Sequence, residues 1–371
     1  MFKKFQVRTF ILLLLFAAAA TVIACSNMFN DIHDGNRLRV GIFLNSYGSG
    51  CQLFTLDSDG KPENISGKLP ALPLFITAAT TLDYDKDGKA DIAMIGSTGI
   101  ILLSGNDDGS FKINFEENPG FNTPQDICYG DFNSDGKPDL AIADSGLNQV
   151  IIYNRGLTPA LYAASGNPAA IEKGDINGDG KIDLFTSSSA NIIDEDTILI
   201  NNSTSNFSFS SSQHVTGYDY GNGEARLFDI DNNGITDLIR VGENYIRIYK
   251  NDGNANFTEI QNISILNVVN ITTGDLDGDG HIDAFIGNSG VSAGVIINNG
   301  NGNFTYKDVF LLLKSVLFDI DFDGDLDVIG YSGTNLYILK NDGKGNFNLH
   351  STAATPITPN DINLFTYHAE D

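Results

Sequence analysis

The sequence has no tryptophan, only 5 histidines and 3 cysteines, and 22 basic residues against 47 acidic ones. A formal charge of −25 argues against nucleic acid as a partner, because phosphate backbones need a basic surface. The histidines stand in unlike contexts and no nucleophile–base pair is visible, so the sequence predicts no catalytic residues. Without tryptophan, carbohydrate binding is less well supported, although 13 tyrosines could stack on sugars.

Acidic residues, in contrast, recur at one fixed spacing. In the stretch DLDGDGHID, Asp275, Asp277 and Asp279 stand at positions 1, 3 and 5, Gly280 at position 6 and Asp283 at position 9. Alternate oxygen side chains in a tight loop suit Ca²⁺, a hard cation that takes six to eight oxygen ligands. Glycine at position 6 readily adopts the positive φ of such a turn, and the carbonyl of position 7 then faces the metal. The stretch therefore predicts a calcium-binding loop.

Five more stretches share the pattern, so the sequence predicts up to six Ca²⁺ ions. The predicted ligands, in the order of positions 1, 3, 5, 7 and 9, are Asp83, Asp85, Asp87, Lys89 and Asp91; Asp131, Asn133, Asp135, Lys137 and Asp139; Asp175, Asn177, Asp179, Lys181 and Asp183; Asp229, Asp231, Asn233, Ile235 and Asp237; Asp275, Asp277, Asp279, His281 and Asp283; and Asp319, Asp321, Asp323, Asp325 and Asp327. Clustered carboxylates repel one another unless a cation lies between them. The metals are therefore expected to be structural.

An EF-hand has the same first half but requires a bidentate Glu at position 12 and a helix on each side. Here position 12 holds Met94, Ile142, Thr186, Arg240, Ile286 and Gly330. Short apolar runs such as 92–95 and 140–143 follow each closing Asp, and runs of this kind indicate buried strands. The loops are therefore predicted to join strands, and an EF-hand is excluded.

The loops begin every 44 to 54 residues, and the same elements recur between them. A second apolar run, such as 245–249, leads into an Asn- and Gly-rich hairpin that ends in Phe, such as 251–257, and a further strand follows. Four strands at this period indicate a β-propeller blade. We therefore predict an all-β fold, a seven-bladed β-propeller of four-stranded antiparallel blades, with calcium loops between strands 1 and 2 of six blades.

The seventh blade is predicted to be divided between the two ends of the chain. Residues 38–44 and 52–56 match the later strands of a blade without a calcium loop, and residues 361–367 match an innermost strand. Pairing of these N- and C-terminal strands would close the ring and remove two exposed sheet edges. Cys51 and Cys128 then fall in different repeats, which argues against a disulfide between them.

These loops and repeats resemble the FG-GAP/VCBS repeat propellers, the group that includes the integrin α-subunit head. The resemblance covers the propeller domain predicted over residues 36–371, and it implies that the D-x-D-x-D-G-x-x-D loop joins the first and second strands of a blade. The FG-GAP tripeptides themselves are poorly kept. Residues 154–162 also lack the Asn-Gly-Phe turn, which leaves the outer hairpin of that blade open.

Residues 1–24 resemble a bacterial lipoprotein signal peptide. Three basic residues precede an apolar run at 10–20, and small residues then lead into Cys25. The resemblance implies a lipid on Cys25, a tether over 25–35 and a chain anchored to a membrane of the bacterial cell envelope, outside the cytoplasm, at the outer membrane or cell surface. An ordinary signal peptide or an N-terminal membrane helix remains open, although the apolar run is short for a span.

Three function classes fit this organisation. The first is a binding or adhesion scaffold for protein partners, the second a glycan-binding propeller, and the third, with least support, a polysaccharide-degrading enzyme. The face opposite the stereotyped calcium loops is expected to carry the variable function. On that face 187–196 and 211–225 are long, and Tyr218, Asp219, Tyr220 and Asn222 are the predicted partner-binding residues.

Overall fold

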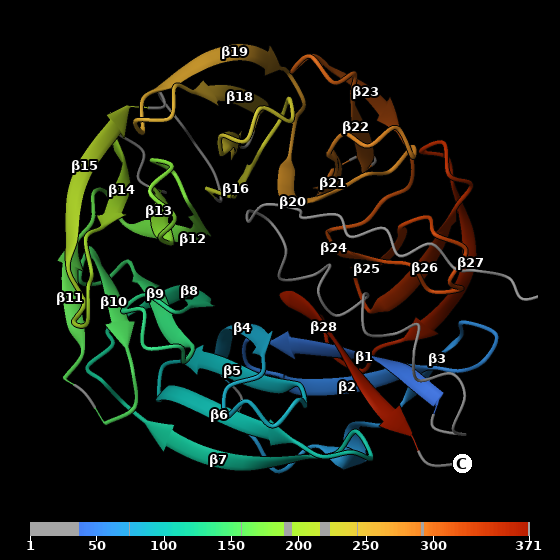
Figure 1. Ribbon diagram of the computed structural model, residues 1–371. Helices are drawn as coiled ribbons and strands as arrows, with labels where there is room; N and C mark the ends of the chain where they lie inside the picture. Colours follow the sequence, from blue (N-terminus) through green and yellow to red (C-terminus); the bar gives the residue numbers. More distant parts are fainter. Residues whose placement is uncertain are drawn as a thin grey trace, which may run out of the picture.

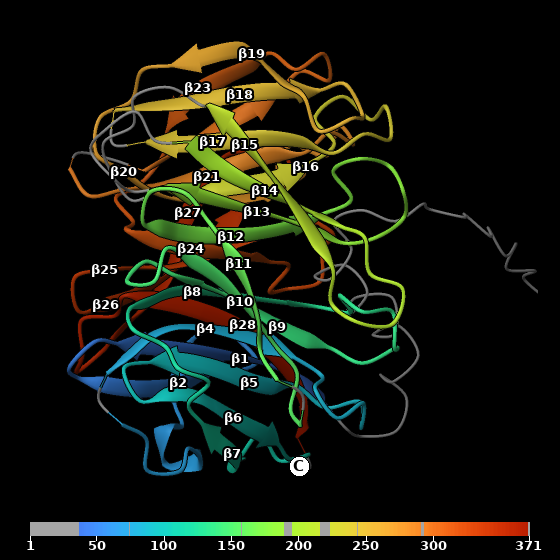
Figure 2. The ribbon, with the colours of Figure 1, turned by 90° about the vertical axis from the view of Figure 1, so that its left-hand side faces the viewer.

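The protein is a ring of seven antiparallel sheets with four strands each, as its computed structural model shows (Figure 1). The structure describes residues 37–73, 75–156, 158–188, 195–215, 223–242, 244–290 and 293–369. Seen from the side, the connections gather on two opposite faces of the ring (Figure 2). The predicted all-β, seven-bladed propeller is confirmed.

Each blade runs from the axis outward in the order in which its strands are named here. Blade 1 is β4 (Ile76–Leu82), β5 (Asp91–Gly96), β6 (Gly99–Gly105) and β7 (Phe111–Glu117); blade 2 is β8 (Pro124–Gly130), β9 (Asp139–Asp144), β10 (Gln149–Tyr153) and β11 (Ala160–Ala163). Blade 3 is β12 (Pro168–Gly174), β13 (Asp183–Ser188), β14 (Glu195–Asn201) and β15 (Phe209–Val215); blade 4 is β16 (Ala225–Phe228), β17 (Asp237–Gly242), β18 (Tyr245–Asn251) and β19 (Phe257–Ile263). Blade 5 is β20 (Val268–Gly274), β21 (Asp283–Asn288), β22 (Gly294–Asn298) and β23 (Phe304–Asp308); blade 6 is β24 (Lys314–Phe318), β25 (Asp327–Ser332), β26 (Asn335–Asn341) and β27 (Phe347–Ala354). Blade 7 is β28 (Asp361–Ala369), β1 (Arg37–Ser46), β2 (Gly50–Leu56) and β3 (Pro62–Asn64), which a short 3₁₀ helix, η2 (Ser66–Lys68), follows.

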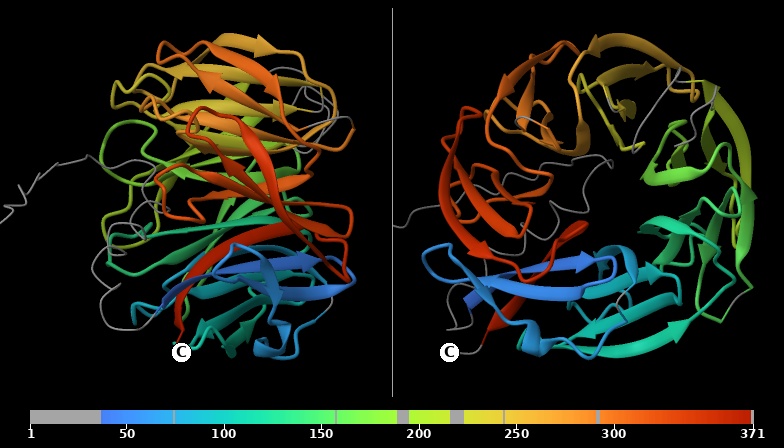
Figure 3. Two further views of the ribbon diagram at one scale, coloured as in Figure 1. Left: turned by 90° about the vertical axis from the view of Figure 1, so that its right-hand side faces the viewer. Right: turned by 180° about the vertical axis from the view of Figure 1, so that it is seen from behind.

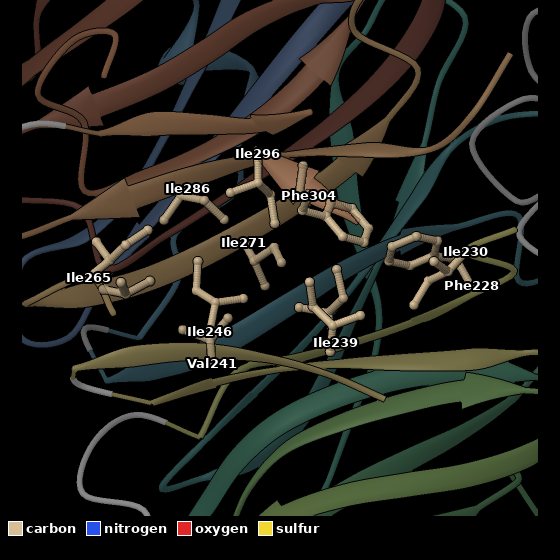
Figure 4. Close-up of a cluster of buried hydrophobic side chains, with 13 residues drawn as sticks. Phe228, Ile230, Ile239, Val241, Ile246, Ile265, Ile271, Ile286, Ile296 and Phe304 are labelled. Atoms are coloured by element: carbon tan, nitrogen blue, oxygen red, sulfur yellow. The ribbon is translucent and has the colours of Figure 1, made fainter. Parts of the chain in front are cut away.

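The hydrophobic core lies between the blades. The second strand of a blade is covered on both sides by its neighbours, and every residue of β5, β9, β17 and β21 is buried. This explains the uninterrupted apolar runs that follow the closing aspartates. Between blades 4 and 5, for example, Ile239 and Ile246 pack toward Ile271, Ile286 and Ile296 (Figure 4). Burial of each such side chain contributes roughly 1.5–3 kcal/mol, so each sheet depends on its neighbours for stability.

The ring closes through the two ends of the described chain. Strand β28 pairs antiparallel with β1 in a continuous register from Arg37↔Ala369 to Asn45↔Asp361, and the two strands lie side by side (Figure 3). Gly41 makes room for this contact, because a Cβ built there would lie 2.0 Å from Cζ of the Phe365 ring. The predicted division of the seventh blade is confirmed.

The strand pairing answers two questions that the sequence analysis left open, the outer hairpin of blade 2 and the state of two cysteines. Residues 154–162 do form an outer hairpin, but a reduced one, because β11 has four residues and pairs with β10 from Ile152↔Ala160 to Gln149↔Ala163. Cys51 and Cys128 lie in blades 7 and 2 and are free, as expected. In the part of the chain that the structure describes, no helix is long and apolar enough to cross a membrane.

Candidate calcium-binding loops

All six predicted loops connect the innermost strand of a blade to its second strand, in blades 1 to 6. They share one set of hydrogen bonds from backbone N–H groups to side-chain oxygens, which are carboxylates in every case except the amide of Asn233. In the loop that starts at Asp275, the N–H of Gly280 donates to Asp275 Oδ2 (2.9 Å) and the N–H of His281 donates to Asp279 Oδ1 (2.9 Å). The equivalent bonds from positions 6 and 7 occur in the other five loops. The turn thus holds the oxygens of positions 1 and 5 within the loop.

Carboxylates converge in four of the loops. In each of them three carboxylates offer oxygens that lie within 4.8 Å of one another: Asp83, Asp85 and Asp91; Asp229, Asp231 and Asp237; Asp275, Asp277 and Asp279; and Asp319, Asp321 and Asp327. The loops at 131 and 175 carry an asparagine at position 3, whose amide oxygen replaces one carboxylate. Within the described residues, Asp231 Oδ1 is buried without a hydrogen-bond partner, although buried oxygens are normally paired. Such an all-oxygen donor set fits Ca²⁺.

The closing aspartate of each loop is buried. Asp283 has 0% of its surface exposed, and it accepts hydrogen bonds from the N–H of Leu276 (2.8 Å) and the N–H of Asn298 (2.7 Å). Burial, only partly offset by these bonds, raises the pKa of this carboxyl to about 6. The same cause raises the pKa of Asp139, Asp183, Asp237 and Asp327 to about 6 as well. A cation beside these groups would favour their charged form.

In blades 3 to 6 an asparagine at the end of the third strand ties the loop of its own blade to the loop of the preceding blade. The side-chain Nδ2 of Asn298 donates to the carbonyl of Ile282 in its own loop (3.2 Å) and to that of Ile230 in the loop of blade 4 (2.7 Å). Asn201, Asn251 and Asn341 make the same pair of bonds in blades 3, 4 and 6. We call these four residues the clasp asparagines. They show that calcium loops and strand 3-to-4 hairpins share one face, as predicted.

Sequence reasoning placed one residue with positive φ in each loop and missed a second. Position 6 is glycine throughout, but position 4 also has positive φ and is Lys86, Ser134, Gly178, Asn232, Gly278 or Phe322. Four of these six are not glycine, so composition gives no signal for the second left-handed residue. Its place in the repeat could have identified it, because position 4 lies two residues before the position-6 glycine in all six loops.

The predicted partner-binding residues Tyr218, Asp219, Tyr220 and Asn222 lie outside the described residues. The face opposite the predicted calcium loops exposes an aromatic pair that the sequence analysis did not single out. Tyr47, in the β1–β2 turn, is 61% exposed and Phe75, just before β4, is 46% exposed, with ring centroids 5.2 Å apart. Neither residue gave a sequence signal, because their contact depends on how blade 7 packs beside blade 1.

A second feature that sequence reasoning missed is a group of charged residues on the innermost strands. Arg226 of β16 binds Glu172 of β12 at 2.7 Å, and Lys314 of β24 lies 3.5 Å from Glu224, reaching past blade 5. Burial raises the pKa of Glu172 to about 7. These ion pairs link blades 3, 4 and 6 around the axis of the ring. Residues so far apart in sequence meet only because the innermost strands all face one centre.

The repeat geometry agrees with a comparison against known families. The family model for FG-GAP-like repeats matches residues 83–142, 131–186, 175–239 and 229–286, which together span more than half of the 371 residues. The chain belongs to the FG-GAP-like repeat family. In this FG-GAP-like protein each family match runs from position 1 of the loop of one blade into the second strand of the next.

Solved structures share the fold of this FG-GAP-like protein at low sequence identity. A lectin of Agrocybe aegerita that recognises non-reducing terminal N-acetylglucosamine is 18% identical, with 90% of this chain and 96% of that chain covered and a TM-score of 0.60. A protein from Lactobacillus plantarum is 13% identical (88% and 99% covered, TM-score 0.64). The periplasmic gluconolactonase of Pseudomonas aeruginosa is 11% identical (89% and 99% covered, TM-score 0.63). No curated protein matches the sequence. The fold therefore occurs in both binding proteins and enzymes.

A clasp asparagine should contribute more to the stability of the fold than its neighbours in the same hairpin. Asn298→Ala removes the donor from two carbonyls, and an unsatisfied buried acceptor costs about 1–3 kcal/mol. We expect the free energy of unfolding, measured by urea denaturation, to fall by about 2 kcal/mol. Asn301→Ala, at an exposed position of the same hairpin, is the control and should change it by less than about 0.5 kcal/mol. Equal effects of the two substitutions would contradict the clasp.

The two left-handed positions of a loop should respond to glycine in opposite ways. Ser134 has φ 60° and Gly136 has φ 81°. Ser134→Gly relieves a conformation that costs an L-residue roughly 1–2 kcal/mol, and we expect a small gain in unfolding free energy. Gly136→Ala should lower it by about 1 kcal/mol through backbone strain alone, because a Cβ at Gly136 meets no atom within 4 Å. The account is wrong if Ser134→Gly destabilises the protein as much as Gly136→Ala does.

Proposed function

We propose that this protein is a calcium-stabilised binding scaffold of the bacterial cell envelope. Up to six Ca²⁺ ions would occupy the loops of blades 1 to 6, a lipid on Cys25 would tether the chain outside the cytoplasm, and one face of the propeller would bind a protein partner. The observation that supports this proposal most strongly is the convergence of three carboxylates within 4.8 Å in four separate loops. The family membership supports a repeat propeller of this kind.

Electrostatics explains why the loops would need the metal. Three or four carboxylates in one turn repel one another by about 1–4 kcal/mol per pair, depending on exposure. Burial of the closing aspartate adds a desolvation cost, as the raised pKa of Asp283 shows. A divalent cation offsets both the repulsion among the carboxylates and the cost of desolvation, because it interacts favourably with every carboxylate around it. The side chains of positions 1, 3, 5 and 9 and the carbonyl of position 7 would hold the ion.

The two faces of the ring would then have different roles, one structural and one in binding. The calcium loops and hairpins form a repeated framework in which the clasp asparagines join one loop to the next. The opposite face consists of turns and blade-to-blade connections that do not repeat in sequence. Tyr218, Asp219, Tyr220 and Asn222 belong to the longest of the loop-to-loop repeats, which runs from Asp175 to Asp229, and stay the proposed partner contacts. We assign no catalytic role to any of these residues.

A glycan-binding function is the second candidate, because of the exposed Tyr47–Phe75 pair. Aromatic rings present apolar area on which sugar C–H groups pack. The Asn360 side chain lies beside the pair, since the N–H of Tyr47 donates to Asn360 Oδ1 (2.5 Å). The Nδ2 of Asn360 donates to the carbonyl of Thr77 (2.9 Å), so this side chain holds the turn of Tyr47 in place beside β4.

Removal of calcium tests the scaffold proposal. We expect excess chelator to lower the melting temperature substantially, because the carboxylate clusters lose their counter-charge, and a ligand that binds only the folded state stabilises it by mass action. Added Ca²⁺ should restore the melting temperature, and an equal concentration of Mg²⁺ should not, because Mg²⁺ requires a tighter octahedral shell. An identical melting curve in chelator and in Ca²⁺ would exclude calcium stabilisation.

Two binding assays separate the candidate functions. A glycan array probed in calcium should remain blank for a protein-binding scaffold, whereas affinity capture from intact envelope extracts should recover a partner that Tyr218→Ala/Tyr220→Ala no longer binds. A specific glycan signal that Tyr47→Ala abolishes, in a variant with an unchanged melting temperature, would favour the glycan-binding alternative. Release of new reducing ends from a polysaccharide would instead indicate an enzyme.

A further inference from the structure

In two of the six loops the aspartate at position 3 is hydrogen-bonded to a lysine from the third strand of the same blade. The Nζ of Lys340, in β26, donates to Asp321 Oδ2 at 2.8 Å, and the Nζ of Lys250, in β18, donates to Asp231 Oδ2. Asp321 and Asp231 both belong to the converging carboxylate clusters of their loops. The ammonium group of a lysine is charged at neutral pH, so the side chain at position 3 of each of these loops meets a full positive charge.

Both lysines occupy the same place in their blades, directly before the clasp asparagine at the end of the third strand. The residues at this place in blades 1 to 6 are Ser104, Tyr153, Ile200, Lys250, Ile297 and Lys340. Ser104 accepts a hydrogen bond from Asn114, and Tyr153 donates one to Glu117. Ile200 and Ile297 pack against hydrophobic clusters. Among these six places, the carboxylate cluster therefore meets a cation in blades 4 and 6 alone.

Another lysine near a loop is differently placed. Lys89, at position 7 of the loop in blade 1, lies 3.7 Å from Asp87 but 3.3 Å from Asp107 of the neighbouring hairpin. Its charge is shared with a carboxylate outside the loop, and it does not contact position 3. The lysines of blades 4 and 6 are distinct because each contacts a side chain of the converging cluster itself.

A fixed cation has two opposite consequences at such a place. Without calcium it reduces the repulsion among the carboxylates, which stabilises the loop. With calcium it repels the divalent ion and lowers its affinity. Each lysine holds one oxygen of its aspartate, and in blade 4 the second oxygen, Asp231 Oδ1, stays without a partner. The lysine therefore leaves an oxygen for the metal while it weakens the attraction.

We propose that Lys250 and Lys340 are resident counter-cations, which keep the loops of blades 4 and 6 ordered without Ca²⁺ and make them the weaker calcium sites. This inference rests on the proposed calcium binding. It divides the six loops into two classes. Along blades 3 to 6, loops whose position 3 contacts a lysine, in blades 4 and 6, alternate with loops whose position 3 does not, in blades 3 and 5. The propeller would then retain part of its framework when external calcium falls, because two of its loops carry a cation of their own.

Blades 5 and 6 provide a natural comparison. Their loops have aspartate at positions 1, 3, 5 and 9, and they differ in the residue before the clasp asparagine, Ile297 against Lys340. A second difference, Asp325 at position 7 in place of His281, adds negative charge to the loop of blade 6. That difference alone would strengthen calcium binding there. The loops also differ at positions 2, 4 and 8, with Phe322 in place of Gly278 at position 4, so the effect of the lysine is tested by substitution within blade 6.

The absence of tryptophan allows one loop to be observed by itself. Phe322, at position 4 of the loop in blade 6, is exposed, and Phe322→Trp would place a single indole there as a fluorescent reporter. In this background we compare Lys340 with Lys340→Ile, which copies blade 5, and with Lys340→Arg, which keeps the charge. The full chain is titrated with Ca²⁺ and is also melted in excess chelator.

Lys340→Ile should lower the Ca²⁺ concentration at half-saturation about fivefold, because one repelling charge is removed, and should lower the melting temperature in chelator. Lys340→Arg should leave both close to the values of the reporter protein. An unchanged midpoint in Lys340→Ile, or a loss of melting temperature that is equal with and without calcium, would overturn the inference and leave calcium binding intact. A reporter protein that shows no response to Ca²⁺ would instead overturn calcium binding at this loop.

Discussion

The buried carboxylate that closes each loop is the constraint on which the structure depends. It lies where a predicted calcium loop meets the start of a second strand that is buried between blades, and its oxygens are held there by hydrogen bonds from both sides of the turn. A buried negative charge costs free energy unless it is hydrogen-bonded or paired. The fold satisfies this need with backbone N–H groups, one of them the N–H of the clasp asparagine, and, in our proposal, with a cation in the loop.

In the closed ring, the stability of each loop also depends on the neighbouring blades. A four-stranded sheet of this size cannot bury both faces alone, so each blade is stable only between two others. The clasp asparagine adds a polar link to that apolar contact, because Asn298 bonds the loop of its own blade and that of the blade before it. Blade 7 has no calcium loop, and there the ring is closed by the β1–β28 pairing instead. One face of the propeller is thus a connected framework, and the other is free to vary.

Much of this could be predicted from the sequence, because the features in question are local. The spacing of aspartates, the glycine at position 6 and the apolar run after Asp283 each have an explanation within ten residues. The division of blade 7 followed from matching two incomplete repeats. The clasp was missed because Asn298 stands in an Asn-Gly hairpin, whose turn propensity already accounts for an asparagine. The contact of Lys340 with Asp321 and that of Arg226 with Glu172 depend on strand register and blade order, which no local pattern encodes.

The central claim, that the loops bind calcium, is tested most directly by a crystal structure of the protein grown in calcium, with anomalous scattering measured to locate the ions. Our account predicts anomalous peaks in the loops of blades 1 to 6, about 2.3–2.6 Å from the side-chain oxygens of positions 1, 3 and 5, with lower occupancy in blades 4 and 6 at limiting calcium. Well-ordered loops without such peaks at saturating calcium would contradict it.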